Sequence, residues 1–162
     1  MLFHKKIIFL LLISWQVVGF SEQIKPFKFS RGSYQQLVDS KKNQPFNLII
    51  WSLSCSSCLK EMDELARFSQ QHPQINLVML STDGDVEAES LQMLLEQKGL
   101  GHLQSWQFSG DNPQKLRYEI DASWYGELPR SYFFNRQQQH TAKSGLLTKS
   151  DYQLMLNHYK AQ

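Results

Sequence analysis

The chain is poor in cysteine, with only two among its 162 residues. Proteins held together by disulfide scaffolds are short and dense in cysteine, so a body of this size must rely on a hydrophobic core. The sequence also lacks internal repeats and low-complexity tracts. We therefore expect one globular domain, and the cysteine pair is free to serve chemistry instead of scaffolding.

Charge of either sign is not in excess. The formal net charge is +2, and Lys5 and Lys6 account for it, because the rest of the chain has 15 basic and 15 acidic residues. No basic block remains outside that segment. Nucleic acid is therefore not an expected partner.

The first 21 residues have the pattern of an export signal. Lys5 and Lys6 precede an apolar stretch at 7–20, and the small residues Gly19 and Ser21 stand at −3 and −1 of a cut after Ser21. The stretch is short for a membrane span, which needs about 20 apolar residues. We predict a signal peptide over 1–21 and a mature domain over 22–162. A retained anchor is the alternative, whereas cleavage leaves no stable membrane insertion.

The two cysteines, Cys55 and Cys58, lie between a predicted strand and a predicted helix. The nearly continuous apolar run at 46–51 is typical of a strand buried on both faces, and residues 59–70 show helical spacing. One sulfur is then placed at a helix N-terminus, where peptide dipoles and free N–H groups stabilise a thiolate. A thiolate attacks disulfides, and a second thiol one turn away resolves the mixed disulfide. This arrangement predicts a redox site.

Two other interpretations of the cysteine pair stay open. A structural disulfide of this spacing closes a very small loop and stabilises the fold little. A zinc site needs two further ligands at close spacing. The histidines of the mature domain show no such pairing: His72, His102, His140 and His158. We therefore expect neither a metal nor an organic cofactor.

Glu61 is out of place for a surface charge. The helix after the cysteines has one apolar side, made of Leu59, Met62, Leu65, Ala66 and Phe68. Cys58 and Glu61 project from this same side, one turn apart. A buried carboxylate has a raised pKa and can transfer protons near neutral pH. The alternative is a helix-edge position from which the carboxylate reaches water.

The rest of the chain alternates strand and helix patterns. Strands are predicted at 24–29, 75–80, 106–108 and 131–134, with 140–143 paired to the last of these. Helices are predicted at 33–40, from a cap at Asp83 or Asp85 to Gly99, at 113–118 and at 152–159. The pattern predicts an α/β fold with a mixed sheet.

A strand followed by Trp-x-x-x-Cys-x-x-Cys, an amphipathic helix and the later Gly126-Glu127-Leu128-Pro129 resembles the TlpA/ResA-like family of exported thiol–disulfide oxidoreductases. The resemblance extends from about residue 27 to the C-terminus. It implies a thioredoxin fold, in which helices flank a central mixed sheet, with an extra βα insertion. It also implies a periplasmic protein that reduces disulfides of exported proteins. The electrons then come from a membrane thiol-transfer protein.

The resemblance assigns roles to individual residues. Cys55 corresponds to the exposed nucleophile, Cys58 to the buried resolving thiol, and Glu61 to an acidic residue that assists proton transfer. Pro129 corresponds to a cis-proline beside the cysteines, which leaves the Leu128 backbone free to pair with an extended substrate. The alternative function is a non-catalytic module of the same fold that binds a peptide or a metal and keeps the cysteine pair static.

The chain departs from the family around the proposed nucleophile. No proline separates the cysteines, since Ser56 and Ser57 stand there, so the redox poise cannot be taken from the family. Ser54 replaces a frequent aromatic residue, and Leu128 is unusual before the proline. An oxidant or isomerase role stays open because direction follows relative reduction potentials. Three aromatic residues either line a substrate groove near Pro129 or pack in the core: Trp124, Tyr125 and Tyr132.

Overall fold

The computed structural model describes residues 25–160, so the predicted signal segment 1–21 lies outside the described residues. The described elements, in chain order, are β1 (Phe27–Phe29), α1 (Ser33–Ser40), β2 (Phe46–Trp51), α2 (Ser56–Gln71), β3 (Leu77–Ser81), α3 (Ala88–Gln97), β4 (Gln104–Phe108), α4 (Pro113–Ile120), β5 (Arg130–Phe134), β6 (His140–Ser144) and α5 (Lys149–Lys160). No helix within 25–160 is long and apolar enough to cross a membrane.

The strands form one mixed sheet in the order β1-β4-β3-β2-β5-β6. The first four strands of this order, β1, β4, β3 and β2, run parallel to one another. Strand β5 is antiparallel to β2, and β6 is antiparallel to β5. All six residues of the central strand β2 are buried, as its continuous apolar run predicted. The predicted α/β fold with a mixed sheet is therefore confirmed.

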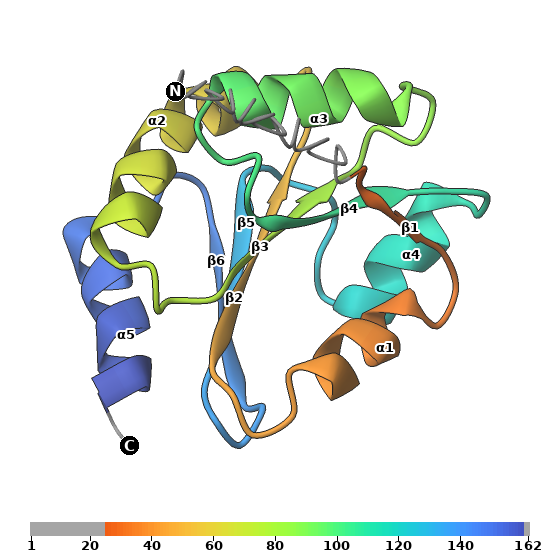
Figure 1. Cartoon of the computed structure of the whole chain (residues 1–162). Helices are drawn as coiled ribbons and strands as arrows, with labels where there is room; N and C mark the ends of the chain where they lie inside the picture. Colours follow the sequence, from red (N-terminus) through yellow and green to blue (C-terminus); the bar gives the residue numbers. More distant parts are fainter. Residues whose placement is uncertain (1–24, 161–162) are drawn as a thin grey trace, which may run out of the picture.

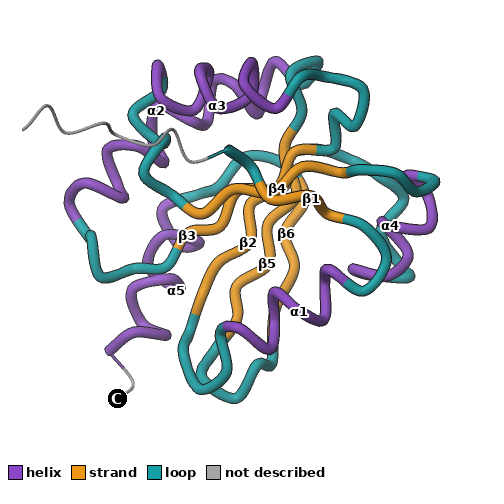
Figure 2. The backbone as a smooth tube through the Cα atoms, turned by 45° about the vertical axis from the view of Figure 1, so that its right-hand side comes forward, coloured by secondary structure: helices purple, strands orange, loops and turns teal. Residues whose placement is uncertain are grey.

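Helices cover both faces of the sheet (Figures 1 and 2). Helices α2, α3 and α5 pack on one face, and α1 and α4 on the other. Strand β2 supplies both cores because alternate side chains point to opposite faces: Ile49 and Trp51 join the first core, and Leu48 and Ile50 the second. The apolar side of α2, including Cys58 and Met62, packs into the first core.

Strand register brings three separate loops to one end of the sheet. Trp51, the last residue of β2, pairs with Ser81 at the end of the parallel strand β3. Ile50 pairs with Arg130, the first residue of the antiparallel strand β5. The loop with the cysteines, the loop after β3 and the segment before β5 therefore meet at this end.

Between β3 and β5 the chain adds a strand and a helix to the expected crossover. This segment contains α3, β4 and α4, which agrees with the predicted βα insertion. Asn112 caps α4 through its side chain, which accepts a hydrogen bond from the Gln114 N–H.

The predicted cap of α3 is wrong. Its N-cap residue is Glu87, which makes no side-chain capping bond, and neither Asp83 nor Asp85 occupies that position. The Asp83 carboxylate instead bonds to the loop that precedes the cysteines. Because its carboxylate oxygens already accept these hydrogen bonds, Asp83 is not available to cap α3.

Candidate active site

Cys55 and Cys58 form a disulfide at the start of α2. Cys55 is the N-cap residue, and its Sγ accepts a hydrogen bond from the Cys58 N–H at 3.1 Å. Cys58 is only 2% exposed, whereas Cys55 is partly exposed. The structure thus places one sulfur at the helix N-terminus, as predicted. In the reduced protein this position favours a thiolate on Cys55, since an N–H group and the helix dipole face the sulfur.

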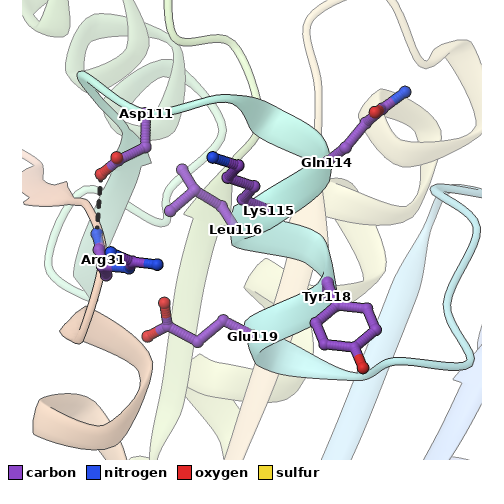
Figure 3. Close-up of a pocket in the computed structure, with 7 residues that line it drawn as sticks. All are labelled: Arg31, Asp111, Gln114, Lys115, Leu116, Tyr118 and Glu119. Carbon is purple, nitrogen blue, oxygen red and sulfur yellow. Dashed lines mark hydrogen bonds between the residues drawn. The ribbon is translucent and has the colours of Figure 1, made fainter.

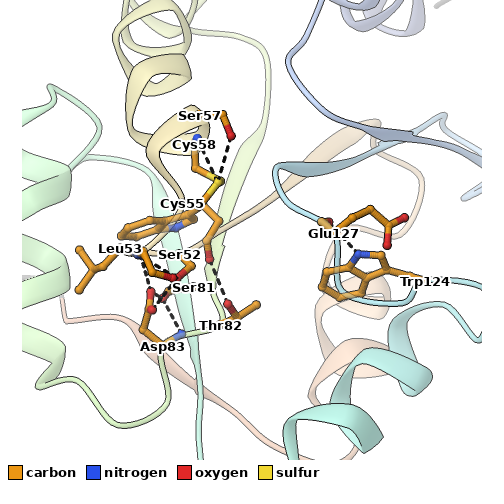
Figure 4. Close-up of a disulfide and its surroundings, with 12 residues drawn as sticks. Ser52, Leu53, Cys55, Ser57, Cys58, Ser81, Thr82, Asp83, Trp124 and Glu127 are labelled. Carbon is orange, nitrogen blue, oxygen red and sulfur yellow. Dashed lines mark hydrogen bonds between the residues drawn. A yellow bond between two sulfur atoms is a disulfide. The ribbon is translucent and has the colours of Figure 1, made fainter.

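A carboxylate holds the turn before Cys55 in place (Figure 4). Oδ2 of Asp83 accepts hydrogen bonds from the Leu53 N–H at 2.8 Å and from Ser81 at 2.7 Å, and Oδ1 accepts one from Ser52 at 2.7 Å. The Ser52 hydroxyl is also 2.9 Å from that of Ser54. The end of β3 is thereby joined to the residues that lead into Cys55.

Sequence reasoning missed this role of Asp83. The available signal was its place two residues after the end of β3, because the carboxyl ends of neighbouring parallel strands meet at one edge of a sheet. The sequence does not show that β3 lies next to β2, because this follows only from the order of the strands in the folded sheet.

Glu61 lies on the buried side of α2, as predicted, and is 5% exposed. Its carboxylate accepts a hydrogen bond from the N–H of Leu147, in the loop before α5. It also lines an open cavity of about 370 Å³ together with Tyr152. Burial raises the pKa of Glu61 and the hydrogen bond from Leu147 opposes that effect, while the nearby charge of Asp151 adds to the rise. The carboxylate is thus desolvated, but its hydrogen-bond partner lies toward α5 and not at the disulfide.

The Leu128–Pro129 peptide bond is cis, as the resemblance implied. Pro129 is buried, and the side chain of Leu128 packs against both cores, one of which is also contacted by Leu53 and Cys55. Within residues 25–160, neither the N–H nor the C=O of Leu128 makes a hydrogen bond. One edge of the chain, at the same end of the sheet as the cysteines, is therefore free to pair with another strand.

The three aromatic residues near Pro129 divide between core and surface. Trp124 is 4% exposed, and its Nε1–H donates to the Glu127 carbonyl at 2.9 Å (Figure 4). Tyr132 is fully buried, and its hydroxyl donates to Asp121 at 3.1 Å. Tyr125 is 92% exposed. Only Tyr125 is therefore at the surface and able to meet a substrate.

A cavity of about 730 Å³ lies elsewhere, between α4 and the turn before α1 (Figure 3). Two carboxylates of its wall accept backbone hydrogen bonds from that turn, Asp111 from Arg31 at 2.9 Å and Glu119 from Gly32 at 2.8 Å. They tie α4 to α1 on the face of the sheet opposite to α2. Across residues 25–160, no group of three or more His, Cys, Asp or Glu side chains is placed to hold a metal ion.

Comparison with known proteins rests on structure alone, because no family model and no curated protein matches the chain. A secreted thiol–disulfide isomerase from Corynebacterium glutamicum matches with a TM-score of 0.63 and 17% identity, over 76% of this chain and 75% of that one. A DsbF homologue from Corynebacterium diphtheriae matches with a TM-score of 0.60 and 16% identity, over 77% and 76%.

A third solved structure is that of a secreted Mycobacterium tuberculosis disulfide oxidoreductase homologous to E. coli DsbE. It matches with a TM-score of 0.56 and 15% identity, over 76% of this chain and 86% of that one. The chain has the thioredoxin fold. At these identities the similarity concerns the fold alone. The proteins that share this fold are of the same type as the family that the sequence resembles. The thioredoxin fold explains why the disulfide and the cis-proline, more than 70 residues apart, lie at the same end of the sheet.

Proposed function

We propose that this protein is an exported thiol–disulfide oxidoreductase that reduces disulfides of other proteins through Cys55 and Cys58. One observation carries the proposal. Cys55 is partly exposed at the N-terminus of α2 and its sulfur accepts a hydrogen bond from the Cys58 N–H, while Cys58 is buried. This arrangement suits a nucleophile in front and a resolving thiol behind.

The reaction transfers two electrons and two protons. In the reduced protein, the Cys55 thiolate attacks one sulfur of a substrate disulfide. The substrate S–S bond breaks, a Cys55–substrate disulfide forms, and the other substrate sulfur leaves as a thiolate that takes up a proton. Cys58 then loses its proton and attacks the Cys55 sulfur, which closes the Cys55–Cys58 bond and releases the second substrate thiol.

Glu61 is the proposed acceptor of the proton from Cys58. It lies one turn after Cys58 on the same buried side of α2, and burial raises its pKa toward the range in which proton transfer is efficient near neutrality. The cavity that it lines gives the proton a route to water. The structure described has no hydrogen bond from Glu61 toward the cysteines, so this role rests on position and burial.

Substrate docking is assigned to Leu128 and Pro129. The free N–H and C=O of Leu128 support pairing with an extended substrate segment. A membrane thiol-transfer protein is the proposed electron donor. Export is supported by the pattern of residues 1–21 and by the secreted neighbours from C. glutamicum and M. tuberculosis.

The test is a trapping experiment. Cys58→Ser lacks the resolving thiol and is expected to accumulate mixed disulfides between Cys55 and exported proteins, whereas Cys55→Ser is expected to form none. Equilibration of the wild-type pair with glutathione then gives its potential and hence the direction of transfer. A pair that resists dithiothreitol under native conditions, with no adduct on Cys58→Ser, would establish a static bridge and refute the proposal.

A further inference from the structure

Arg130 occupies a buried site directly after the cis Leu128–Pro129 bond. Its side chain is only 11% exposed, and Nη2 donates to the Asp121 carboxylate at 2.8 Å. The Asp121 side chain, just after α4, is 18% exposed. An arginine enclosed to this degree must have its donors satisfied, because an unpaired buried charge is costly.

Two further donors of Arg130 bind residues of strands β5 and β6. Nη1 donates to the Ser144 hydroxyl, at the end of β6, at 2.7 Å, and Nε donates to the Tyr132 hydroxyl at 3.1 Å. The guanidinium therefore joins the end of α4 to β5 and β6. Its planar, forked set of donors makes this possible, and a lysine ammonium does not have that geometry.

The same cluster also reaches the residue before Leu128. The Ser144 hydroxyl donates to the Glu127 carboxylate at 2.9 Å, and that carboxylate is 3.7 Å from Arg130. The Trp124 indole holds the Glu127 carbonyl. Gly145 donates to the Pro129 carbonyl at 2.9 Å. The two-residue segment is therefore fixed on both sides, while the Leu128 N–H and C=O stay free among the described residues.

We propose that Arg130 is a positioning residue for substrate docking. Through Asp121, Ser144 and Glu127 it holds the free Leu128 peptide groups beside Cys55, in place to pair with the backbone of a disulfide-bearing chain. The inference rests on the proposed function and adds residues to it, since no sequence motif marked Arg130. A substrate without a peptide backbone cannot use these groups, so its reaction does not depend on the cluster.

The test compares two substrates of the reduced protein. One is a fluorescent extended peptide with a single cysteine in a mixed disulfide with glutathione, and the other is hydroxyethyl disulfide. Arg130→Lys keeps the charge but loses the planar set of guanidinium donors. Ser144→Ala removes the hydrogen bond to Glu127, at a partly exposed position that tolerates a small change. Thr141→Ala is the control, because Thr141 is exposed on the same strand β6.

For the first two variants we expect a rise in KM for the peptide of roughly fivefold to tenfold with kcat unchanged, because binding common to ground and transition states is lost. The rate with hydroxyethyl disulfide and the potential of the cysteine pair should stay at wild-type values. Thr141→Ala should match the wild type throughout.

An unchanged peptide KM in both variants would overturn the inference, and so would equal losses with both substrates, which indicate a general structural role. Either result leaves the proposed function intact while the wild type is active. A wild type inactive with both substrates would instead refute the proposed function and the inference with it.

Discussion

Replacing Glu61 by glutamine separates the stability role of this residue from its proposed chemistry. Glutamine has the same shape and keeps an oxygen to accept the Leu147 N–H, but it has no charge to desolvate. Since Glu61 is 5% exposed and burial raises its pKa, we expect Glu61→Gln to be more stable than the wild type at pH 7. The gain should be about 1 kcal/mol, the lower end of the cost of desolvating a polar group, or roughly 3 °C in Tm.

The dependence on pH has a definite sign. As pH rises past about 4, the unfolded chain loses the Glu61 proton first, whereas the folded protein retains it because its pKa is raised. The contribution of Glu61 to the free energy of unfolding therefore falls with rising pH until its folded pKa is passed, and stays lower above it. Glu61→Gln has no such proton, so the two proteins should be equally stable below pH 4, and their difference should grow above it until the folded pKa of Glu61 is passed.

Denaturant unfolding of the oxidised proteins between pH 3 and 8 measures this difference, with Glu64→Gln as the matched control. Glu64 is on the same helix, its side chain is 57% exposed, and it pairs with Arg67 at the surface. Its replacement should change stability by no more than about 0.5 kcal/mol. A Glu61→Gln protein that is less stable at pH 7, or whose difference from wild type does not change with pH, would show that the carboxylate is not desolvated.

Thiol exchange by the same variant tests the chemistry. If Glu61 accepts the Cys58 proton, Glu61→Gln should slow reduction of a protein disulfide roughly tenfold to 100-fold at pH 7 and remove one ionisation from the pH–rate profile. Glu64→Gln should retain the wild-type profile. A wild-type rate in Glu61→Gln would exclude Glu61 from proton transfer, whatever the stability result.

Two further predictions concern the loops around the site. Burial alone would raise the pKa of Asp121, but hydrogen bonds from Ser123, Arg130 and Tyr132 lower it to about 2 from an ordinary 3.8. Asp121→Asn should therefore lower the free energy of unfolding by about 2 kcal/mol at pH 7. Denaturant unfolding at lower pH should show this loss shrinking toward pH 2, and a loss that is constant with pH would contradict the prediction. Asp83→Asn should cost about 1 to 2 kcal/mol by denaturant unfolding because an amide cannot accept every bond that the carboxylate accepts. Asp85→Asn, at an exposed neighbour, should stay within about 0.5 kcal/mol, and equal effects would refute a specific role for Asp83.

Much of the fold followed from local pattern. The bounds predicted for α1 and β2 agree with the structure, because apolar periodicity and a flanking Pro45 mark them clearly. Strand β3 begins two residues later and β4 two residues earlier than predicted, since strand ends depend on pairing with neighbours. The order of the strands in the sheet does not follow from local pattern, because it depends on pairing between segments far apart in the chain.

The candidate site was partly accessible from the sequence. The Cys55–Cys58 pair, the burial of Glu61 and the cis bond at Pro129 were all expected and are all present. Their roles in catalysis stay predictions. The direction of the Glu61 carboxylate, toward Leu147, could not be expected because the loop before α5 comes more than 80 residues later.

By itself, the sequence determined the chemistry available here: two thiols at a strand–helix junction, a carboxylate on an apolar helix side and a late proline. These features are local, since helix spacing and strand burial follow from neighbouring residues. Only the tertiary structure decided what holds that chemistry in place. Asp83 reaches the turn before Cys55, and Arg130 anchors the chain directly after Leu128–Pro129 to Asp121 and Ser144, because strands β2 and β3 end where β5 begins. The partner of a charged side chain cannot be predicted from the sequence when only the folded sheet brings the two residues together.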